Sequence, residues 1–314
     1  MHDRVQVRKT IKRQCKRRVK EQIGRCVGIQ FLYAVPYFLL VLILYLTIFG
    51  DLFVLYANGY RGNALSMAME RNLNSVWLVI FVMLVVTGPL MYGMMRFYIG
   101  LFRGEEPGVS ALFQPFTSLH SFWAGVRMEF CLFFRQLLWS VLPTALFFFV
   151  GMGLLVNAVA SGHYLTQTDL TVAVAVLYVF YQLVLIPIRI KVMTYQAGWV
   201  LISEHEALGA WDATRDGSGV FHGHYGKVLL FVLSFFWWYV LSGLVSGLCW
   251  LIAMFGFVFI PGASGFVAFL LALAAGACLG VVINGFLAAY INTSFIGLFE
   301  FYAGRTQDVS QPEQ

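Results

Sequence analysis

The chain has 314 residues, of which 60% are hydrophobic and 11% are charged, and its formal net charge is +6 at pH 7. Soluble domains carry about 25% charged residues, so the mean hydropathy of +0.78 excludes a water-soluble globular fold and places most of the chain in lipid. Ten of the 21 lysines and arginines lie between Arg4 and Arg25, so the positive charge belongs mainly to one N-terminal segment.

Residues 1–26 are predicted to form a basic amphipathic helix. An apolar residue recurs at every fourth position, at Val7, Ile11, Cys15, Val19 and Ile23. The basic residues around this stripe are Arg8, Lys9, Lys12, Arg13, Lys16, Arg17, Arg18 and Lys20. Such a helix is typical of binding to an anionic inner leaflet, and the alternative is an arm that docks on nucleic acid or a partner protein. Because an arm bound to phosphates needs no apolar stripe, we expect anionic membrane lipids as partners, a protein partner as the alternative, and no nucleic acid.

Six apolar runs are long enough to cross a bilayer core of about 30 Å, which takes about 20 helical residues. They are Gly28–Phe49, Val76–Leu101, Phe130–Ala158, Leu170–Ile188, Val228–Phe259 and Phe266–Leu298. Backbone polar groups in hydrocarbon must be satisfied within the segment, so these runs are predicted to be helices. The sequence therefore predicts an all-α, polytopic membrane helical bundle of about six transmembrane helices over residues 27–304, followed by a disordered cytoplasmic tail at residues 305–314.

The placement of lysine and arginine predicts how this bundle is oriented. With the N-terminus inside, the external loops hold only Arg61 and Arg71, and the other 19 of the 21 basic residues fall on the cytoplasmic side. This asymmetry follows the positive-inside rule. We therefore expect a multi-pass protein of a bacterial cytoplasmic (inner) membrane, with both termini in the cytosol.

Two substantial cytoplasmic connections are expected, at residues 103–129 and 189–227. In the second connection, Ile190–Ile202 is interpreted as an interfacial helix that follows a break at Pro187. The alternative is that this segment extends the fourth span as one continuous helix.

The remainder of the second connection, Ser203–Tyr225, is rich in glycine and is expected to be a mobile loop. Its histidine, aspartate and glutamate residues are types that bind divalent metals, but their spacing matches no metal motif. His222 and His224 are therefore only weak metal candidates, and no cofactor is expected. The chain also contains no Walker A, HExxH, GxSxG or GxGxxG pattern, so no catalytic residue is assigned.

Charged and polar residues within or beside membrane spans are the usual candidates for function. The candidates for contact with a lipid headgroup or another ligand are Arg96, Arg135, Arg189, Lys191 and Asn284. For the four cations, which lie near predicted cytoplasmic ends, the alternative is interfacial anchoring, and for Asn284 it is interhelical hydrogen bonding. Two small-residue pairs, Gly243/Gly247 and Gly276/Gly280, predict close packing of the fifth and sixth spans.

Several short motifs along the chain resemble those of one family. They are Gly88-Pro89-Leu90, Gly93 with Arg96-Phe97, Arg103-Gly104-Glu105, Leu112-Phe113, Ile186-Pro187, Leu233-Ser234-Phe235-Phe236-Trp237 and Phe301-Tyr302. With the basic N-terminal run, they are similar to a bacterial family of integral membrane proteins described as domain of unknown function number nine-seven-five. The resemblance implies a basic N-terminal helix, about six spans and a bacterial membrane location, but no activity. The stretch Asp216–His224 departs from the charged helix of that family, which argues against a helix there.

Three functional hypotheses follow from these patterns. The first is a non-enzymatic helical bundle that binds lipid or a partner protein, because the basic amphipathic helix is present and catalytic motifs are absent. The second is a transporter or channel for a small or amphiphilic solute, because a helix broken at Pro187 and a polar Asn284 are typical of transport sites. The third is an interfacial membrane enzyme that acts on lipid through the Ser203–Tyr225 loop.

Overall fold

The computed structural model describes residues 2–57, 63–160, 167–259 and 263–305, and each regular element in these ranges is a helix. The elements are α1 (His2–Glu21), α2 (Ile23–Ala57), α3 (Asn63–Arg103), the 3₁₀ turns η1 (Val109–Leu112) and η2 (Gln114–Thr117), α4 (Leu119–Ala160), α5 (Gln167–Tyr195), α6 (Gly198–Glu204), α7 (Ala210–Gly219), α8 (Tyr225–Leu233), α9 (Phe236–Phe259) and α10 (Ala263–Tyr302). The all-α class is confirmed. The predicted tail lies outside the described residues from position 306 onward.

Five of these helices, α2, α3, α4, α5 and α10, are long and apolar enough to cross a membrane. A sixth candidate is the pair α8 and α9, which passes the same test when the two are taken together and is bent by 40° at its break. The count confirms the prediction of about six spans for the residues that the structure describes. The chain is therefore a multi-pass membrane protein.

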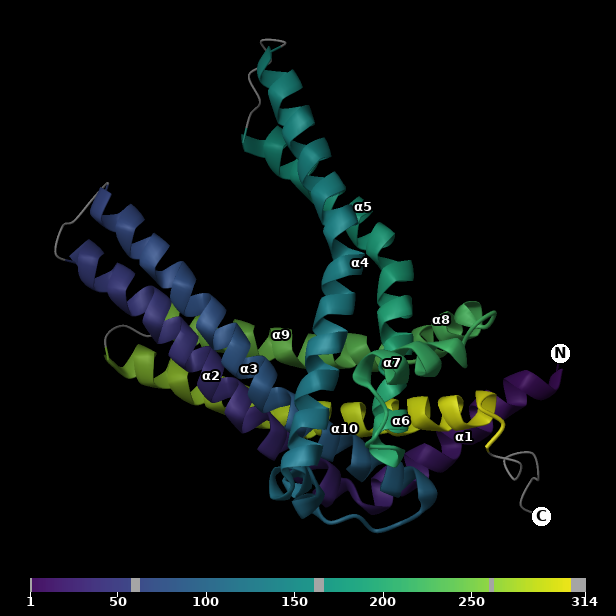
Figure 1. Ribbon diagram of the computed structural model, residues 1–314. Coiled ribbons are helices and arrows are strands. Elements are labelled where there is room, and N and C mark those ends of the chain that lie inside the picture. The colour runs from purple at the N-terminus through teal and green to yellow at the C-terminus, as the bar shows by residue number, and fades with distance from the viewer. Residues whose placement is uncertain (1, 58–62, 161–166, 260–262, 306–314) are drawn as a thin grey trace.

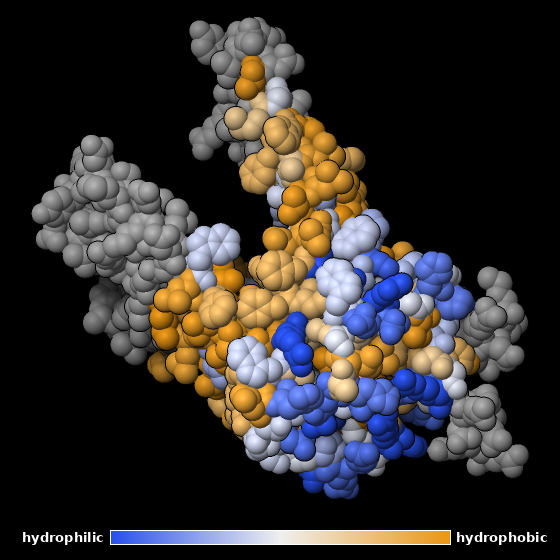
Figure 2. All heavy atoms as spheres, in the orientation of Figure 1, coloured by the Kyte–Doolittle hydropathy of each residue, from blue (hydrophilic) through white to orange (hydrophobic). Residues whose placement is uncertain are grey.

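The spans form two diverging groups that meet at one end (Figure 1). One group contains α2, α3, α9 and α10, which pack on one another, and the other is the α4–α5 hairpin. The elements α1, η1, η2, α6 and α7 gather where the two groups meet, and we call this region the polar base. Figure 2 shows hydrophobic residues covering the described part of the α4–α5 hairpin and hydrophilic residues gathering over the polar base, which is the surface pattern of a protein partly embedded in lipid.

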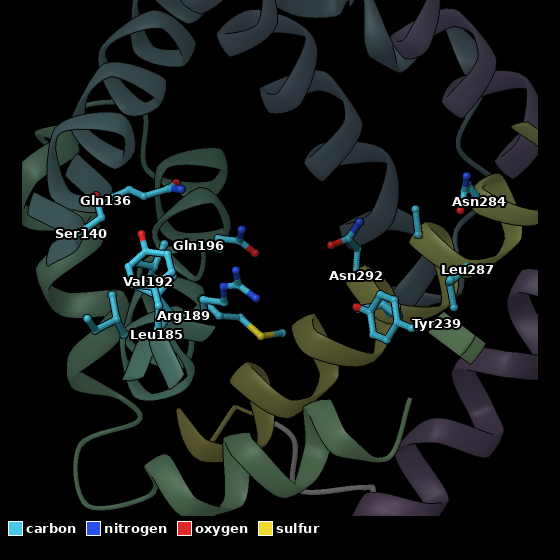
Figure 3. Close-up of a pocket in the computed structure, with 15 residues that line it drawn as sticks. Gln136, Ser140, Leu185, Arg189, Val192, Gln196, Tyr239, Asn284, Leu287 and Asn292 are labelled. Carbon is cyan, nitrogen blue, oxygen red and sulfur yellow. The ribbon is translucent and has the colours of Figure 1, made fainter. Parts of the chain in front are cut away.

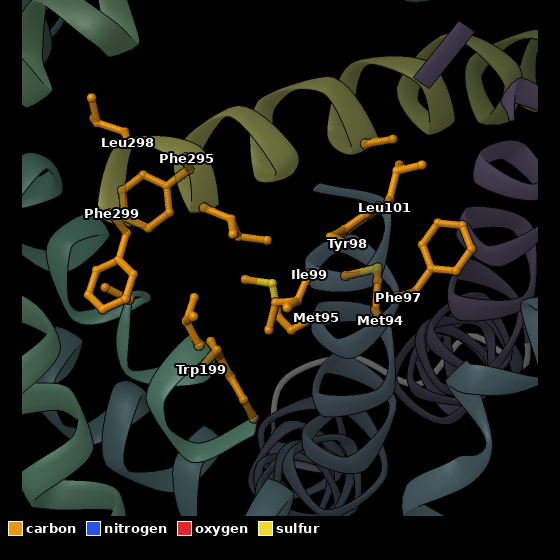
Figure 4. Packing of buried hydrophobic residues seen from close by; sticks show 14 of the residues in the cluster. Met94, Met95, Phe97, Tyr98, Ile99, Leu101, Trp199, Phe295, Leu298 and Phe299 are labelled. Carbon is orange, nitrogen blue, oxygen red and sulfur yellow. The ribbon is translucent and has the colours of Figure 1, made fainter. Parts of the chain in front are cut away.

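The best-packed core lies next to the polar base, where α3, α6 and α10 meet (Figure 4). Phe97 and Tyr98 of α3, Trp199 of α6 and Phe295 and Phe299 of α10 are at most 2% exposed. Farther along the spans, most large apolar side chains are exposed instead. A protein in water would bury those side chains, so lipid is their natural surrounding.

Glycines in α3 and α4, rather than the predicted pairs of the last two spans, allow two membrane spans to approach closely. A Cβ atom on Gly88 would lie 2.7 Å from the carbonyl oxygen of Gly125, where α3 crosses α4. A Cβ atom on Gly243, Gly247 or Gly280 would meet nothing within 4 Å. The predicted packing of the last two spans is confirmed, since α9 packs on α10. The predicted role of these three glycines in that contact is wrong.

The predicted helix break at Pro187 is wrong, because α5 continues through this proline to Tyr195. A proline removes one backbone hydrogen bond, and a long helix packed on neighbours tolerates that loss. The extension of the fourth span is therefore the better description up to Tyr195. The helix α6 that follows is not interfacial, since Trp199 and Ile202 are each 1% exposed within the core.

The expected loop between Ser203 and Tyr225 is largely helical, because it contains α7. One of its glycines serves packing: a Cβ atom on Gly217 would lie 2.6 Å from the backbone nitrogen of Gly198 in α6. The expectation that the Gly-rich stretch from residue 216 lacks a helix is therefore wrong as far as Gly219, where α7 ends.

The N-terminal helix α1 is confirmed, but its apolar stripe faces protein rather than lipid. Ile11, Cys15 and Val19 are at most 1% exposed, and α1 packs on α10. A Cβ atom on Gly297 of α10 would lie 2.8 Å from Ile11 Cγ2, so this glycine makes room for the stripe. The predicted contact of the stripe with the membrane surface is therefore wrong for these residues. An apolar residue at every fourth position predicts that a helix packs on an apolar surface, but it does not distinguish lipid from protein.

The docking of α1 on α10 predicts a disulfide between Cys15 and a cysteine placed at position 294. Burial raises the pKa of the Cys15 thiol to about 12, against smaller opposite effects from the neighbouring Ser294 hydroxyl and Arg18. In a chain without the other cysteines, Ser294→Cys should cross-link to Cys15 under copper-phenanthroline oxidation, as detected by peptide mass mapping. Asn292→Cys is the control and should remain uncoupled. Equal coupling of both variants would contradict the docked position of α1.

Candidate functional site

A polar cleft of about 640 Å³ lies between the α4–α5 hairpin and the pair α9–α10. The polar residues of its walls are Gln136 and Ser140 of α4, Tyr181, Arg189 and Gln196 of α5 and the adjoining turn, Tyr239 of α9, and Asn284 and Asn292 of α10. Figure 3 shows Arg189 and Gln196 pointing toward Asn292 across the open space. The cleft therefore joins the two diverging helix groups through polar side chains that face one another.

Arg189 is the charged residue of this cleft. It lies two residues after Pro187 on α5, and its Nη2 atom donates a hydrogen bond to Gln182 Oε1 at 2.8 Å. No acidic residue is among the described residues that line the cleft. A cation without an acidic neighbour gives the cleft a positive potential, so the cleft favours an anionic ligand.

The amides of α10 extend the polar lining along the membrane span. Asn284 and Asn292 are eight residues apart, which corresponds to about 12 Å along the helix axis. Ser242 Oγ donates a hydrogen bond to Asn284 Oδ1 at 2.9 Å, so the amide nitrogen of Asn284 remains a donor for a ligand. The predicted site residues Arg189 and Asn284 are therefore brought to one cleft.

Sequence reasoning missed Gln136, Gln196 and Tyr239, which complete the cleft. These side chains are uncharged and come from three segments of the chain, so neither the charge nor the spacing of the sequence marks them. The one available signal is an amide within an apolar run, and Gln136 in the third predicted span carries it.

Lys191 lies on the opposite side of α5 from Arg189, because two residues on a helix are about 200° apart. Its Nζ atom donates a hydrogen bond to the hydroxyl of Tyr225 in α8 at 2.6 Å. It lines a separate groove with Trp139 and Tyr225 rather than the polar cleft.

Arg96 is held inside the protein by Glu206. Its Nη2 atom lies 3.1 Å from Glu206 Oε1, and the same carboxylate accepts hydrogen bonds from the Tyr92 hydroxyl at 2.8 Å and from Ser121 Oγ at 3.1 Å. Burial tends to raise the pKa of Glu206, but hydrogen bonds from Tyr92, His120 and Ser121 and the charge of Arg96 together lower it. This geometry gives Arg96 a structural role.

Arg135 is also occupied by protein groups. Its guanidinium lies 3.8 Å from the ring centre of Trp211 in α7 and 4.6 Å from that of Tyr195 in α5. Its Nη2 atom donates a hydrogen bond to the Trp211 carbonyl at 3.1 Å, and the residue is 9% exposed. Arg135 therefore links α4 to α5 and α7. The neighbouring residue Gln136, rather than Arg135, lines the polar cleft.

The two weak metal candidates do not converge on a site. The His224 ring lies 4.8 Å from the Tyr302 ring, and the His222 ring lies 6.5 Å from the Tyr225 ring. Within the described ranges, no three His, Cys, Asp or Glu residues are placed to hold a metal ion. Glu204 forms ion pairs with Arg103 and Arg305, so this acidic residue of the expected loop links α6 to the ends of α3 and α10.

The basic residues of α1 differ in how far they are exposed: Lys12 contacts protein groups, whereas four others face outward. Lys12 donates hydrogen bonds to the carbonyl and hydroxyl oxygens of Ser234 at 3.2 and 2.9 Å, at the bend between α8 and α9. Burial, followed by the charges of Arg8 and Lys16, lowers the pKa of Lys12. The outer set is exposed and consists of Lys9, Arg13, Arg17 and Lys20. This outer set keeps the capacity to attract anionic surfaces.

Comparison with known proteins places the chain in a family by sequence. The model of the family described as "Protein of unknown function (DUF975)" matches residues 1–296, from α1 through most of α10. No curated protein and no solved structure matches the chain. The matched range includes each residue that lines the cleft. Because the match covers nearly the whole sequence, the chain belongs to the DUF975 family.

Proposed function

We propose that this protein is a non-enzymatic membrane protein that binds an anionic amphiphile in the polar cleft. The observation that carries the proposal is Arg189, a cation with no acidic partner in the described part of the chain, in a cleft lined by amide side chains. An anionic headgroup would accept hydrogen bonds from Arg189, Gln196 and Asn292. Its apolar tail would lie between the two helix groups.

The surroundings of the cleft support an amphiphile rather than a free polar solute. Leu185, Ile188 and Val192 of α5 line the same cleft, as do Leu287 and Ile291 of α10, so apolar side chains lie beside its polar walls. With the polar base in the cytosol of a bacterial cell, as the positive-inside pattern predicts, the cleft would open toward the inner leaflet. The exposed cations of α1 would add attraction to anionic lipids there.

Replacement of Arg189 tests this proposal. Arg189→Gln should weaken the binding of one phosphatidylglycerol molecule by at least about tenfold, because a charge-assisted hydrogen bond contributes about 1.5–3 kcal/mol. Native mass spectrometry of the detergent-solubilised protein, titrated with phosphatidylglycerol or phosphatidylcholine, measures the effect. Arg127→Gln is the charge-matched control, since Arg127 is exposed and bonds only to the Trp123 carbonyl of its own helix. Equal losses in both variants, or no loss in Arg189→Gln, would refute the cleft as the site.

Transport of the amphiphile is the second candidate, and the depth of Asn284 in α10 favours it. Polar lining that reaches well into a span is typical of a path as well as of a binding site. Vesicles that contain the protein and fluorescent phosphatidylglycerol distinguish the two functions by dithionite quenching of the outer leaflet. Movement between leaflets that Asn284→Leu abolishes would indicate transport, and binding without movement would indicate a binding protein.

A further inference from the structure

A second cavity, of about 590 Å³, lies between α4, α5 and α8. We call it the α5–α8 groove. Its walls include Trp139 of α4, Ile188, Ile190 and Lys191 of α5, and Tyr225 and Leu229 of α8. It shares only Ile188 with the lining of the polar cleft, and the two cavities present different cations. The groove is therefore a separate place at which a ligand could bind.

Lys191 gives this apolar groove a single positive charge. No acidic side chain pairs with Lys191 in the ranges that the structure covers, and its hydrogen bond goes to the Tyr225 hydroxyl at 2.6 Å. Its ammonium also lies 4.8 Å from the Tyr225 ring centre and 5.2 Å from that of Tyr195. An ammonium has three donors, so the hydrogen bond to Tyr225 leaves donors for an anion.

The aromatic residues of the groove have different roles: the Tyr225 hydroxyl lies beside Lys191 at the polar end, and Trp139 contributes to the apolar wall. Trp139 Nε1 donates a hydrogen bond to the Tyr195 hydroxyl at 3.1 Å, so the polar atom of Trp139 is satisfied by protein. What Trp139 offers to the groove is apolar ring surface, which Ile188 and Leu229 continue. Tryptophan and tyrosine with this arrangement are typical of the membrane interface, where phosphate groups lie.

We infer that the α5–α8 groove holds one acyl chain of an anionic phospholipid, whose phosphate binds Lys191 Nζ and the Tyr225 hydroxyl. Charge complementarity selects this occupant, because the quaternary ammonium of a zwitterionic lipid such as phosphatidylcholine would oppose the charge of Lys191. A free anion would have to leave water for a wall that is almost entirely apolar. Since Lys191 is on α5 and Tyr225 is on α8, the bound phosphate would link these two helices.

The test must separate this groove from the polar cleft, which is also proposed to bind an anionic amphiphile. Variants of Lys191 are therefore made both in the wild-type chain and in the Arg189→Gln background, and lipid binding is measured by native mass spectrometry. Lys191→Met should weaken the binding of one of the two phosphatidylglycerol molecules by about tenfold in both backgrounds, with no change for phosphatidylcholine. Because the loss is also measured in the wild-type chain, the groove is tested even if Arg189→Gln itself has no effect on lipid binding.

Matched variants show whether the effect belongs to the Lys191 charge. Lys191→Arg keeps the cation and should retain most of the binding. Lys227→Met is the control on α8, because Lys227 contacts His224 and the Tyr302 ring rather than the groove. Circular dichroism and gel filtration confirm that each variant is folded. Unchanged binding in Lys191→Met, or an equal loss in Lys227→Met, would overturn the assignment.

Discussion

Gly93→Ala should destabilise the protein by about 3 kcal/mol, the upper end of the range for overpacking. A Cβ atom at this position would lie 2.4 Å from the carbonyl oxygen of Leu112 and 2.7 Å from that of Ala111. These are backbone atoms of η1, so a single rotamer change cannot relieve the clash. The main chain of α3 or of the connection to α4 would have to move, and the core residue Leu112 would move with it.

Thermal unfolding of the protein in detergent, followed by circular dichroism, measures this effect. Gly243→Ala is the matched control, because it makes the same change in α9 where nothing lies within 4 Å. Alanine has a higher helix propensity than glycine by about 1 kcal/mol, so the control should be neutral or slightly more stable. A Gly93→Ala variant as stable as Gly243→Ala would show that η1 does not pack against α3 as described.

The helices of this fold were predictable, whereas their divergence was not. Apolar runs of about 20 residues without charge specify spans by length alone, and the six predicted runs correspond to α2, α3, α4, α5, the α8–α9 pair and α10. The angle between the α4–α5 hairpin and the other spans depends on close contacts such as Gly88 with Gly125, which join residues far apart in sequence. A hydropathy pattern contains no information on such pairs.

The candidate site was predicted in part, for a related reason. A charge near a membrane span is a sound signal for function, and it identified Arg189 and Lys191, each without an acidic partner among the residues described. The same signal identified Arg96, whose partner Glu206 lies 110 positions later in the chain. A single sequence does not reveal that pairing. Stacking on Trp211 from α7, likewise invisible in sequence, removed Arg135 from the set of free cations.

The interaction of Glu206 with Arg96 leads to the second large expected effect. Glu206→Ala should destabilise the protein by about 2 kcal/mol, because Arg96, Tyr92 and Ser121 would lose their shared acceptor. This value is below that for a fully buried pair, since both charged side chains are about 30% exposed. Glu106→Ala is the control: Glu106 pairs with Arg25 at 3.2 Å but is 75% exposed, so its loss should cost about 0.5 kcal/mol.

The pH dependence of unfolding tests whether the Glu206 carboxylate stabilises the protein in its charged form, without truncating the side chain to alanine. Burial raises the pKa of the Glu206 carboxyl, but hydrogen bonds from Tyr92, His120 and Ser121 and the charge of Arg96 together lower it below its usual value of 4.5 in the folded protein. The unfolded chain therefore binds this proton more readily, so the stabilisation is complete above about pH 5.5 and is lost as the pH falls through the folded pKa. Between about pH 5.5 and pH 3.5, the wild-type protein should lose more stability than Glu206→Gln, which has no proton to gain at this position. Parallel stability profiles for the two proteins would mean that the Glu206 carboxylate is not held in its charged form by Arg96 and its neighbours.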